Sequence, residues 1–289
     1  MSRIQEILKK AERDGTVQRT RPLVPDAPPP PGGVAAPAIS VPPAWTPAAM
    51  EAQDTIAAPA RRVTSTLDPL LVASFAPQSL AAEQYRSLRT RVKACENGRA
   101  YRALIITSPN KGDGKTLTAA NLALTMAQEF QQRVLLIDAD LRRPSIHRLL
   151  GIGEAPGLSD VLMGGTTFDD ALVEIADHHL IVLPSGNGAV HPAELLGSAR
   201  MRRVLDTVRT RFDRVILDMP PVSPLADVSI VSGMADGILM IVRAGVTPKP
   251  AIERALSGLE RSKVLGLVLN DAGDASARYD YDGYGYVAG

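Results

Sequence analysis

Short apolar segments alternate with longer, helix-like stretches between residues 67 and 272, and this region is the main domain that we expect. The apolar segments are rich in Val, Ile and Leu, which is typical of strands buried on both faces. Strands of this kind, separated by helices, indicate a mostly parallel central sheet in a three-layer α/β/α fold. The expected strands are residues 103–107, 134–137, 180–183, 215–217, 238–242 and 265–269.

The N-terminal residues do not show this alternation. Ile4, Ile7, Leu8 and Ala11 recur at helical spacing, so we expect an amphipathic helix within residues 1–15. Basic side chains surround this helix and leave two alternatives open. Either it docks on a partner or an anionic membrane surface, or it is a fraying terminus.

Residues 16–66 have the composition of a linker. Eleven of the 23 prolines lie between residues 16 and 60, among many alanines and few large apolar side chains. Proline favours extended polyproline II, and little apolar surface is available to offset the entropy of ordering the segment. We therefore expect a disordered spacer in front of the main domain.

A glycine-rich segment follows the first expected strand. It reads Ser108-Pro-Asn-Lys-Gly-Asp-Gly-Lys-Thr116 and precedes a helix-like stretch at residues 117–129. In a phosphate-binding loop, backbone amides and the helix N-terminus bind phosphate oxygens, Lys115 contacts the β and γ phosphates, and Thr116 offers a hydroxyl to Mg²⁺. The sequence predicts a P-loop NTPase fold that binds ATP and Mg²⁺, although Pro109 replaces the first glycine of the usual pattern. The expected nucleotide-binding residues in this segment are Asn110, Lys111, Gly112, Asp113, Gly114, Lys115, Thr116 and Leu117.

Acidic residues follow two other expected strands. Asp138 and Asp140 end the second strand and Asp218 ends a later one, at the edge where parallel sheets bind their ligands. Two carboxylates beside a nucleotide either hold Mg²⁺ or its waters, or accept a proton from an incoming hydroxyl. Asp218 has the pattern of the carboxylate that holds nucleotide Mg²⁺.

These residues lead to a set of expected roles. Lys115, Asp138 and Asp140 are expected to be catalytic, with Asp138 as the base. The expected metal-binding residues are Thr116, Asp140 and Asp218. Asn270, at the end of the last strand, is placed either to hydrogen-bond the nucleotide base or to cap a helix.

Composition limits the cellular compartments and the classes of partner that we expect for this protein. Thirty-two basic and 31 acidic side chains leave a net charge of +1, so we expect no nucleic acid partner. Cys95 is the only cysteine, which excludes an intrachain disulfide and favours a reducing cytoplasm. The chain has no uninterrupted run of about 18 apolar residues and no secretory signal pattern at its start, so we expect a cytoplasmic protein.

Tyrosines are concentrated at the C-terminal end, within residues 273–289 that we expect to form a flexible tail. Four of the six tyrosines are found there, next to aspartates and glycines. Phenols in such a segment are either phosphate acceptors or groups that stack on a partner. The four residues are Tyr279, Tyr281, Tyr284 and Tyr286.

Glu83, Arg86 and Arg89 lie three residues apart on one flank of an expected helix. On spacing alone, a solvated charged face explains them well. Together with the P-loop, the Asp-x-Asp-x-Arg run at 138–142, the Asp-x-Pro-Pro run at 218–221 and the tyrosine tail, however, they resemble the bacterial tyrosine kinases of capsule and exopolysaccharide loci. The resemblance is to the form without a membrane domain, and it covers residue 67 to the C-terminus.

This resemblance implies a kinase that phosphorylates its C-terminal tyrosines in trans within a ring-shaped homo-oligomer and regulates polysaccharide polymerisation and export. It implies that Glu83, Arg86 and Arg89 mediate the assembly. It also implies an activating partner, the cytoplasmic segment of a membrane polysaccharide co-polymerase, and a cognate tyrosine phosphatase. The kinase would then be cytoplasmic and held at the inner membrane through its partner.

Two other hypotheses remain at this point. The partition and division-site ATPases share the sheet and the carboxylate signatures, but they carry a lysine directly after the first P-loop position, where this chain has Asn110. They often end in an amphipathic helix instead of a tyrosine cluster. The third hypothesis is a non-catalytic scaffold that binds nucleotide only to drive its assembly.

Overall fold

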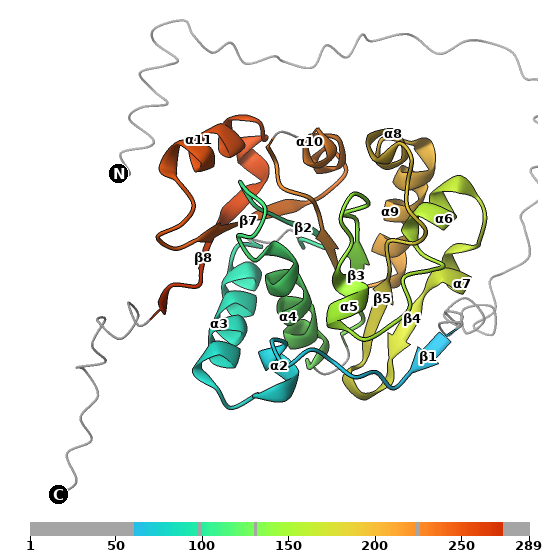
Figure 1. The fold of residues 1–289 in the computed structure, drawn as a ribbon, viewed down its shortest axis with the longest axis horizontal. Helices are drawn as coiled ribbons and strands as arrows, with labels where there is room; N and C mark the ends of the chain where they lie inside the picture. Colours follow the sequence, from blue (N-terminus) through green and yellow to red (C-terminus); the bar gives the residue numbers. More distant parts are fainter. Residues whose placement is uncertain (1–60, 97–99, 130–131, 224–225, 274–289) are drawn as a thin grey trace, which may run out of the picture. The chain divides into compact units, whose positions relative to one another are not determined.

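An eight-stranded sheet lies at the centre of the described part of the chain (Figure 1). The computed structural model describes residues 61–96, 100–129, 132–223 and 226–273. The expected N-terminal helix, most of the expected linker and the four tail tyrosines lie outside the described residues.

The strand order is β1-β4-β5-β3-β6-β2-β7-β8. All neighbouring strands are parallel except β4 and β5, which are antiparallel. The sheet is thus mostly parallel, as the apolar pattern predicts. The strands are β1 (Arg61–Val63), β2 (Ala103–Thr107), β3 (Val134–Asp138), β4 (Val173–Ile175), β5 (Leu180–Leu183), β6 (Arg214–Asp218), β7 (Gly237–Arg243) and β8 (Val264–Asn270).

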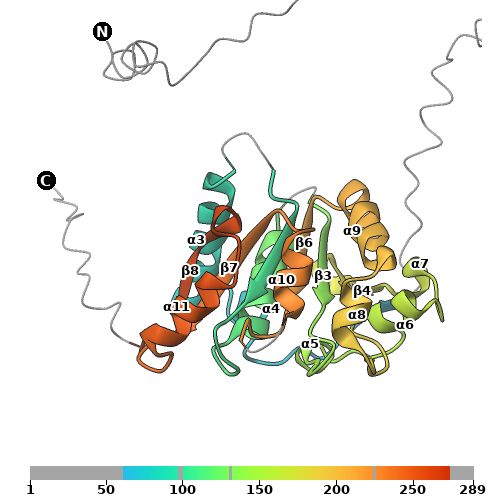
Figure 2. The ribbon, with the colours of Figure 1, turned by 90° about the horizontal axis from the view of Figure 1, so that it is seen from above.

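Helices cover both faces of this sheet (Figures 1 and 2). Side chains alternate between the faces along each strand, so Ile105 of β2 joins one apolar core and its neighbours Leu104 and Ile106 join the other. On the side of Leu104 lie α2 (Val72–Phe75), α3 (Leu80–Ala94), α4 (Lys115–Ala127) and α5 (Ile146–Leu149). The core of Ile105 is covered by α6 (Leu158–Met163), α7 (Phe168–Ala171), α8 (Pro192–Leu196), α9 (Ala199–Arg211), α10 (Asp227–Ser232) and α11 (Lys249–Ser257). Two short 3₁₀ helices, Ala176–His178 and Arg261–Lys263, complete the described elements.

The structure corrects the sequence-based reading at one sheet edge. Strands β1 and β4 were not expected, and β1 lies at Arg61–Val63, within the residues assigned to the linker. The folded region therefore begins before residue 67. Both strands are three residues long, and β1 reads Arg-Arg-Val, so neither has the apolar run of 4–8 residues that marks a buried strand in a sequence.

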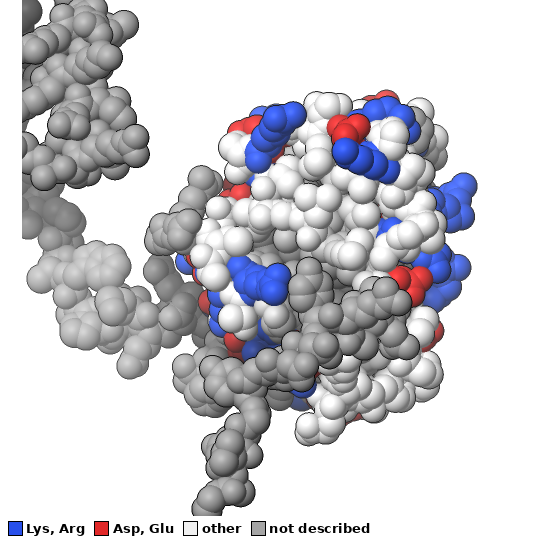
Figure 3. All heavy atoms as spheres, turned by 90° about the vertical axis from the view of Figure 1, so that its left-hand side faces the viewer, with Lys and Arg blue, Asp and Glu red and all other residues white. Residues whose placement is uncertain are grey.

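The opposite edge of the sheet is β8. Its Leu267 and Leu269 are 51% and 62% exposed, and Figure 3 shows that residues other than Lys, Arg, Asp and Glu make up most of the described surface visible on this side. As an edge strand, β8 has backbone groups that face away from β7. No helix in the described segments is long and apolar enough to cross a membrane.

The sheet topology places three loops at one edge. Because β3-β6-β2 are neighbours and mutually parallel, the residues that follow them leave the sheet at the same end. This is the end at which the candidate site lies.

Candidate active site

The glycine-rich segment forms a tight loop between β2 and α4. Gly112 and Gly114 have φ of 88° and 96°, a left-handed conformation that only glycine adopts without strain. A Cβ at Gly114 would overlap the amide nitrogen of Asn270. Asn270 Nδ2 donates to the carbonyl of Asp113 at 3.0 Å, so the end of β8 lies directly against the loop.

Asp113 ties this loop to a distant segment. Its side chain is buried, and one carboxylate oxygen accepts the amide of Asn110 at 2.8 Å. The other oxygen accepts the hydroxyl of Thr247 at 2.8 Å, from the loop between β7 and α11. The carboxylate of Asp113 thus holds the P-loop in shape, and Thr247 is a supporting residue that sequence reasoning missed.

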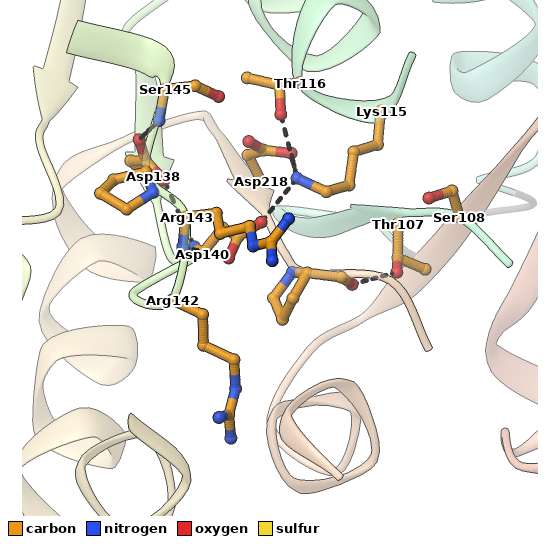
Figure 4. A network of polar contacts seen from close by, with 12 residues as sticks. Thr107, Ser108, Lys115, Thr116, Asp138, Asp140, Arg142, Arg143, Ser145 and Asp218 are labelled. Atoms are coloured by element: carbon orange, nitrogen blue, oxygen red, sulfur yellow. Dashed lines mark hydrogen bonds and ion pairs between the residues drawn. The ribbon is translucent and has the colours of Figure 1, made fainter. Parts of the chain in front are cut away.

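Lys115 lies at the point where the three loops meet (Figure 4). Its Nζ is 2.8 Å from Asp140 Oδ2 and 3.5 Å from Asp218 Oδ1, and it donates to Thr116 Oγ1 at 3.0 Å. Burial alone would lower the pKa of Lys115, but the negative charges of Asp218 and Asp140 outweigh it and raise the pKa above its ordinary value. The lysine therefore stays charged, as phosphate binding requires.

Asp218 is fully buried at the end of β6, and burial raises the pKa of this carboxyl to about 6 against the opposing charge of Lys115. Its Oδ1 lies 3.5 Å from Lys115 Nζ, so one charge partner is present, but close contacts within the described residues do not fill its hydrogen-bonding capacity. A buried carboxylate in this condition is costly unless something binds it. Its oxygens, the Thr116 hydroxyl and Asp140 are hard donors of the kind that Mg²⁺ prefers.

In the described segments there is no group of three His, Cys, Asp or Glu side chains positioned to hold a metal ion by themselves. Magnesium at nucleotide sites is bound by one or two protein carboxylates and by the phosphates of the substrate, and it keeps several waters.

Asp138 is buried at the end of β3 and turns toward its own chain. One oxygen accepts the amides of Ser145 and Ile146, both at 3.0 Å, and the other accepts the amide of Asp140 at 3.3 Å. Burial, with the charge of Asp218 adding to it, raises the pKa of Asp138 to about 7 in spite of these amide contacts. Asp138 thus shapes the loop after β3 and titrates near neutral pH.

Arg142 and Asp227 form a two-point ion pair beside the site. Arg142 Nε and Nη2 are 2.6 and 3.0 Å from the two oxygens of Asp227. Asp227 is the first residue of α10 and its side chain is 1% exposed, whereas Arg142 is 37% exposed. Sequence reasoning missed Asp227, and an acid at the start of a helix after the Asp-x-Pro-Pro run was the available signal.

A cavity of about 950 Å³ opens above these side chains. Its lining comes from the P-loop and the start of α4, from α5 and the segment that joins β3 to it, and from Glu154, Pro220, Pro221 and Ser223. Lys111 and Leu117, two of the residues expected to bind nucleotide, line it as well.

The three residues expected to mediate assembly lie on α3 and do not line the cavity. Glu83 and Arg86 pair at 2.7 Å on the outside of α3. Arg89 is largely buried against α4, where it contacts Glu129 at 3.2 Å and donates to the carbonyl of Thr125 at 2.9 Å. Arg89 therefore joins α3 to the C-terminal end of the P-loop helix.

Comparison with known proteins identifies the family of this chain. The family model described as an AAA domain matches residues 102–260. Tyrosine-protein kinase YwqD of Bacillus subtilis is 37% identical over 217 residues, which cover 74% of this chain and 91% of the relative.

Solved kinase structures are also similar. The kinase domain of the Escherichia coli tyrosine kinase ETK has a TM-score of 0.67 and 27% identity, covering 74% of this chain and 89% of that one. The BceF tyrosine kinase domain has a TM-score of 0.64 and 33% identity, covering 70% and 82%. The P-loop fold, the lysine between two aspartates and these relatives lead to one conclusion: this chain is a nucleotide-binding enzyme that belongs to the bacterial tyrosine-protein kinase family.

Proposed function

We propose that this kinase transfers the γ phosphoryl group of ATP to the tyrosines of its own C-terminal tail, in trans within a homo-oligomer. The observation that carries the proposal is the position of Lys115 Nζ, which contacts both Asp140 and Asp218 at the mouth of the P-loop. The acceptors are Tyr279, Tyr281, Tyr284 and Tyr286.

The chemistry is a displacement at phosphorus. The phenol oxygen forms a bond to the γ phosphorus, the bond from that phosphorus to the β–γ bridging oxygen breaks, and ADP leaves. The phenol proton passes to a carboxylate. Because the transition state is loose, most of the rate comes from positioning and from positive charge near the γ phosphate, which Lys115 and the loop amides supply.

Thr116, Asp140 and Asp218 are proposed to hold Mg²⁺. When bound, this ion neutralises charge on the phosphates. The buried oxygens of Asp218, which have capacity left beside the ion pair with Lys115, support the assignment.

Asp138 stays the proposed base. Because it is fully buried, binds backbone amides with both oxygens and does not line the cavity, the phenol proton reaches it through a side chain that does, such as Asp140. A general base works best when its pKa is near the working pH, and the pKa of Asp138 is raised to about 7. Asn270 is proposed to contact the nucleotide, since it lies against the loop at Asp113.

Assembly and regulation form the wider part of the proposal. Glu83 and Arg86 lie on the accessible side of α3 and are proposed to bind a neighbouring subunit, while Arg89 holds that helix on α4. By resemblance to the family, the cytoplasmic segment of a membrane polysaccharide co-polymerase activates the kinase and brings it to the inner membrane. Tail phosphorylation, reversed by a cognate tyrosine phosphatase, then regulates capsule or exopolysaccharide export.

A mixing experiment tests the transfer in trans. Full-length Lys115→Met protein, which keeps its tail, is incubated with ATP, Mg²⁺ and an active chain that lacks residues 273–289. We expect phosphate on the tail of the inactive chain, mapped by mass spectrometry. Lys249→Met, at a lysine whose side chain is 86% exposed, is the matched control and should keep full activity.

Three results would contradict the proposal. The first is a tail that stays unmodified while the active chain turns over ATP. The second is phosphate on the Lys115→Met chain in the absence of the active chain. The third is incorporation that persists after all four tail tyrosines are replaced by phenylalanine.

A further inference from the structure

The cavity wall opposite the P-loop has cationic side chains that are not needed for the proposed binding of ATP. Arg143 and Arg148, in and next to α5, line the cavity with exposed side chains. Neither forms an ion pair with a described residue. The one side-chain hydrogen bond of Arg148 goes to the backbone carbonyl of Pro144, at 2.9 Å.

Arg142, their neighbour in sequence, behaves differently. Its guanidinium is held by both oxygens of Asp227, and Figure 4 shows it directed away from Lys115, whereas Arg143 extends toward the side of Lys115 and Asp218. The two adjacent arginines thus have different roles. Arg142 fixes the loop to α10, and Arg143 keeps its charge available to the cavity.

Titratable side chains other than arginine also line this wall. His147 and Glu154 line it and are 3.9 Å apart, so the carboxylate of Glu154 partly offsets the charge. Lys111 adds a further exposed cation on the P-loop side. The cavity therefore has positive charge on both sides of the catalytic carboxylates, and only the P-loop side is needed for the phosphates of ATP.

The side of the cavity lined by Arg143 and Arg148 suits a ligand with negative charge, such as an acidic peptide that contains a tyrosine. The tail provides one: after Arg278, Asp280 and Asp282 alternate with Tyr279 and Tyr281. We propose that Arg143 and Arg148 form an acceptor subsite that binds aspartates next to the reacting tyrosine, so that the kinase selects Tyr-Asp segments. The inference rests on the proposed function, because it names what that same site recognises in its acceptor.

The test separates acceptor recognition from phosphoryl transfer. The donor is the full chain with its four tail tyrosines changed to phenylalanine, alone or with Arg143→Gln and Arg148→Gln. The acceptors are full-length Lys115→Met chains, with the natural tail or with Asp280→Asn and Asp282→Asn. Arg203→Gln is the matched control, since Arg203 is an exposed arginine of α9 that does not line the cavity.

Initial rates at low acceptor concentration give the result. For the natural tail, the double arginine variant should lower kcat/KM by about fivefold to thirtyfold, as expected for two partly exposed charge pairs. For the neutral tail the same variant should change kcat/KM by less than about twofold. The KM for ATP should stay the same, and the advantage of the natural tail should shrink as salt is added.

Equal losses for both tails would overturn the subsite, and a raised KM for ATP would assign the arginines to the nucleotide instead. A binding measurement keeps the inference testable if no tyrosine is phosphorylated. A labelled peptide with the sequence of residues 279–286 should bind the wild-type chain with ADP more tightly than its Asn-substituted copy, and this preference should vanish in the double variant. Binding without phosphorylation would refute the proposed function alone, and phosphorylation without charge dependence would refute the subsite alone.

Discussion

Breaking the ion pair of Arg142 and Asp227 from its two ends should have unequal effects on stability. Removing one partner of a buried pair costs about 3–5 kcal/mol, because the other charge is left buried and alone. Here the two partners differ, since the side chain of Asp227 is 1% exposed and that of Arg142 is 37% exposed.

The exposed fractions of the two side chains determine how much stability each substitution is expected to cost. Arg142→Ala leaves a buried carboxylate whose remaining support is the N-terminus of α10, so the free energy of unfolding should fall by about 3 kcal/mol. Asp227→Asn leaves an arginine that water can reach, and the loss should be about 1 kcal/mol. The double variant should lose less than the sum, since the costly lone carboxylate is absent from it.

Urea unfolding of the full chain without nucleotide, followed by circular dichroism, measures these differences. Arg62→Ala is the control, because Arg62 is 63% exposed and lies 3.6 Å from Glu174 in a surface pair. This variant should change the free energy of unfolding by less than about 0.5 kcal/mol. If Asp227→Asn proved as costly as Arg142→Ala, or if the double variant showed additive losses, the reasoning from burial would be refuted.

Three further predictions follow from the site. Gly114→Ala should weaken ATP binding at least about tenfold, because φ is 96° and the new Cβ overlaps Asn270; unchanged affinity by titration calorimetry would argue against the loop geometry. Thr247→Val should cost about 1–2 kcal/mol in urea unfolding, since buried Asp113 loses a donor, and a neutral effect would mean that this contact contributes nothing. The pKa of Asp138 is raised to about 7 from an ordinary value of 3.8, so the folded state binds its proton more tightly than the unfolded state does. Without divalent cations, the free energy of unfolding should therefore fall as pH rises from 5 to 8, and Asp138→Asn should make this dependence shallower; equal slopes would exclude Asp138 as its source.

The sequence predicted those features whose defining residues lie close together along the chain. The P-loop could be predicted because glycines, lysine and threonine lie within nine consecutive residues, and six strands could be predicted because each has a continuous apolar run. The same rule explains the misses. Strands β1 and β4 are only three residues long. They are stabilised by pairing with neighbouring strands, so their own residues give little sign that a strand forms there.

The convergence of Lys115, Asp140 and Asp218 could be predicted only in part. Their positions after apolar strands indicated the shared edge of the sheet, since parallel strands end on one side. Only the observed order β3-β6-β2 made these strands neighbours and brought the side chains within 2.8 to 3.5 Å.

The supporting contacts were decided by tertiary structure alone. Asp227 lies 85 residues from Arg142, and Thr247 lies 134 residues from Asp113. The acid at the start of α10 was a visible signal for Asp227, but no pattern along the chain identifies its partner Arg142, and nothing marks Thr247. Their roles arise because chain folding removes the groups from water, and a buried polar group must then find its partner in whatever segment the fold brings beside it.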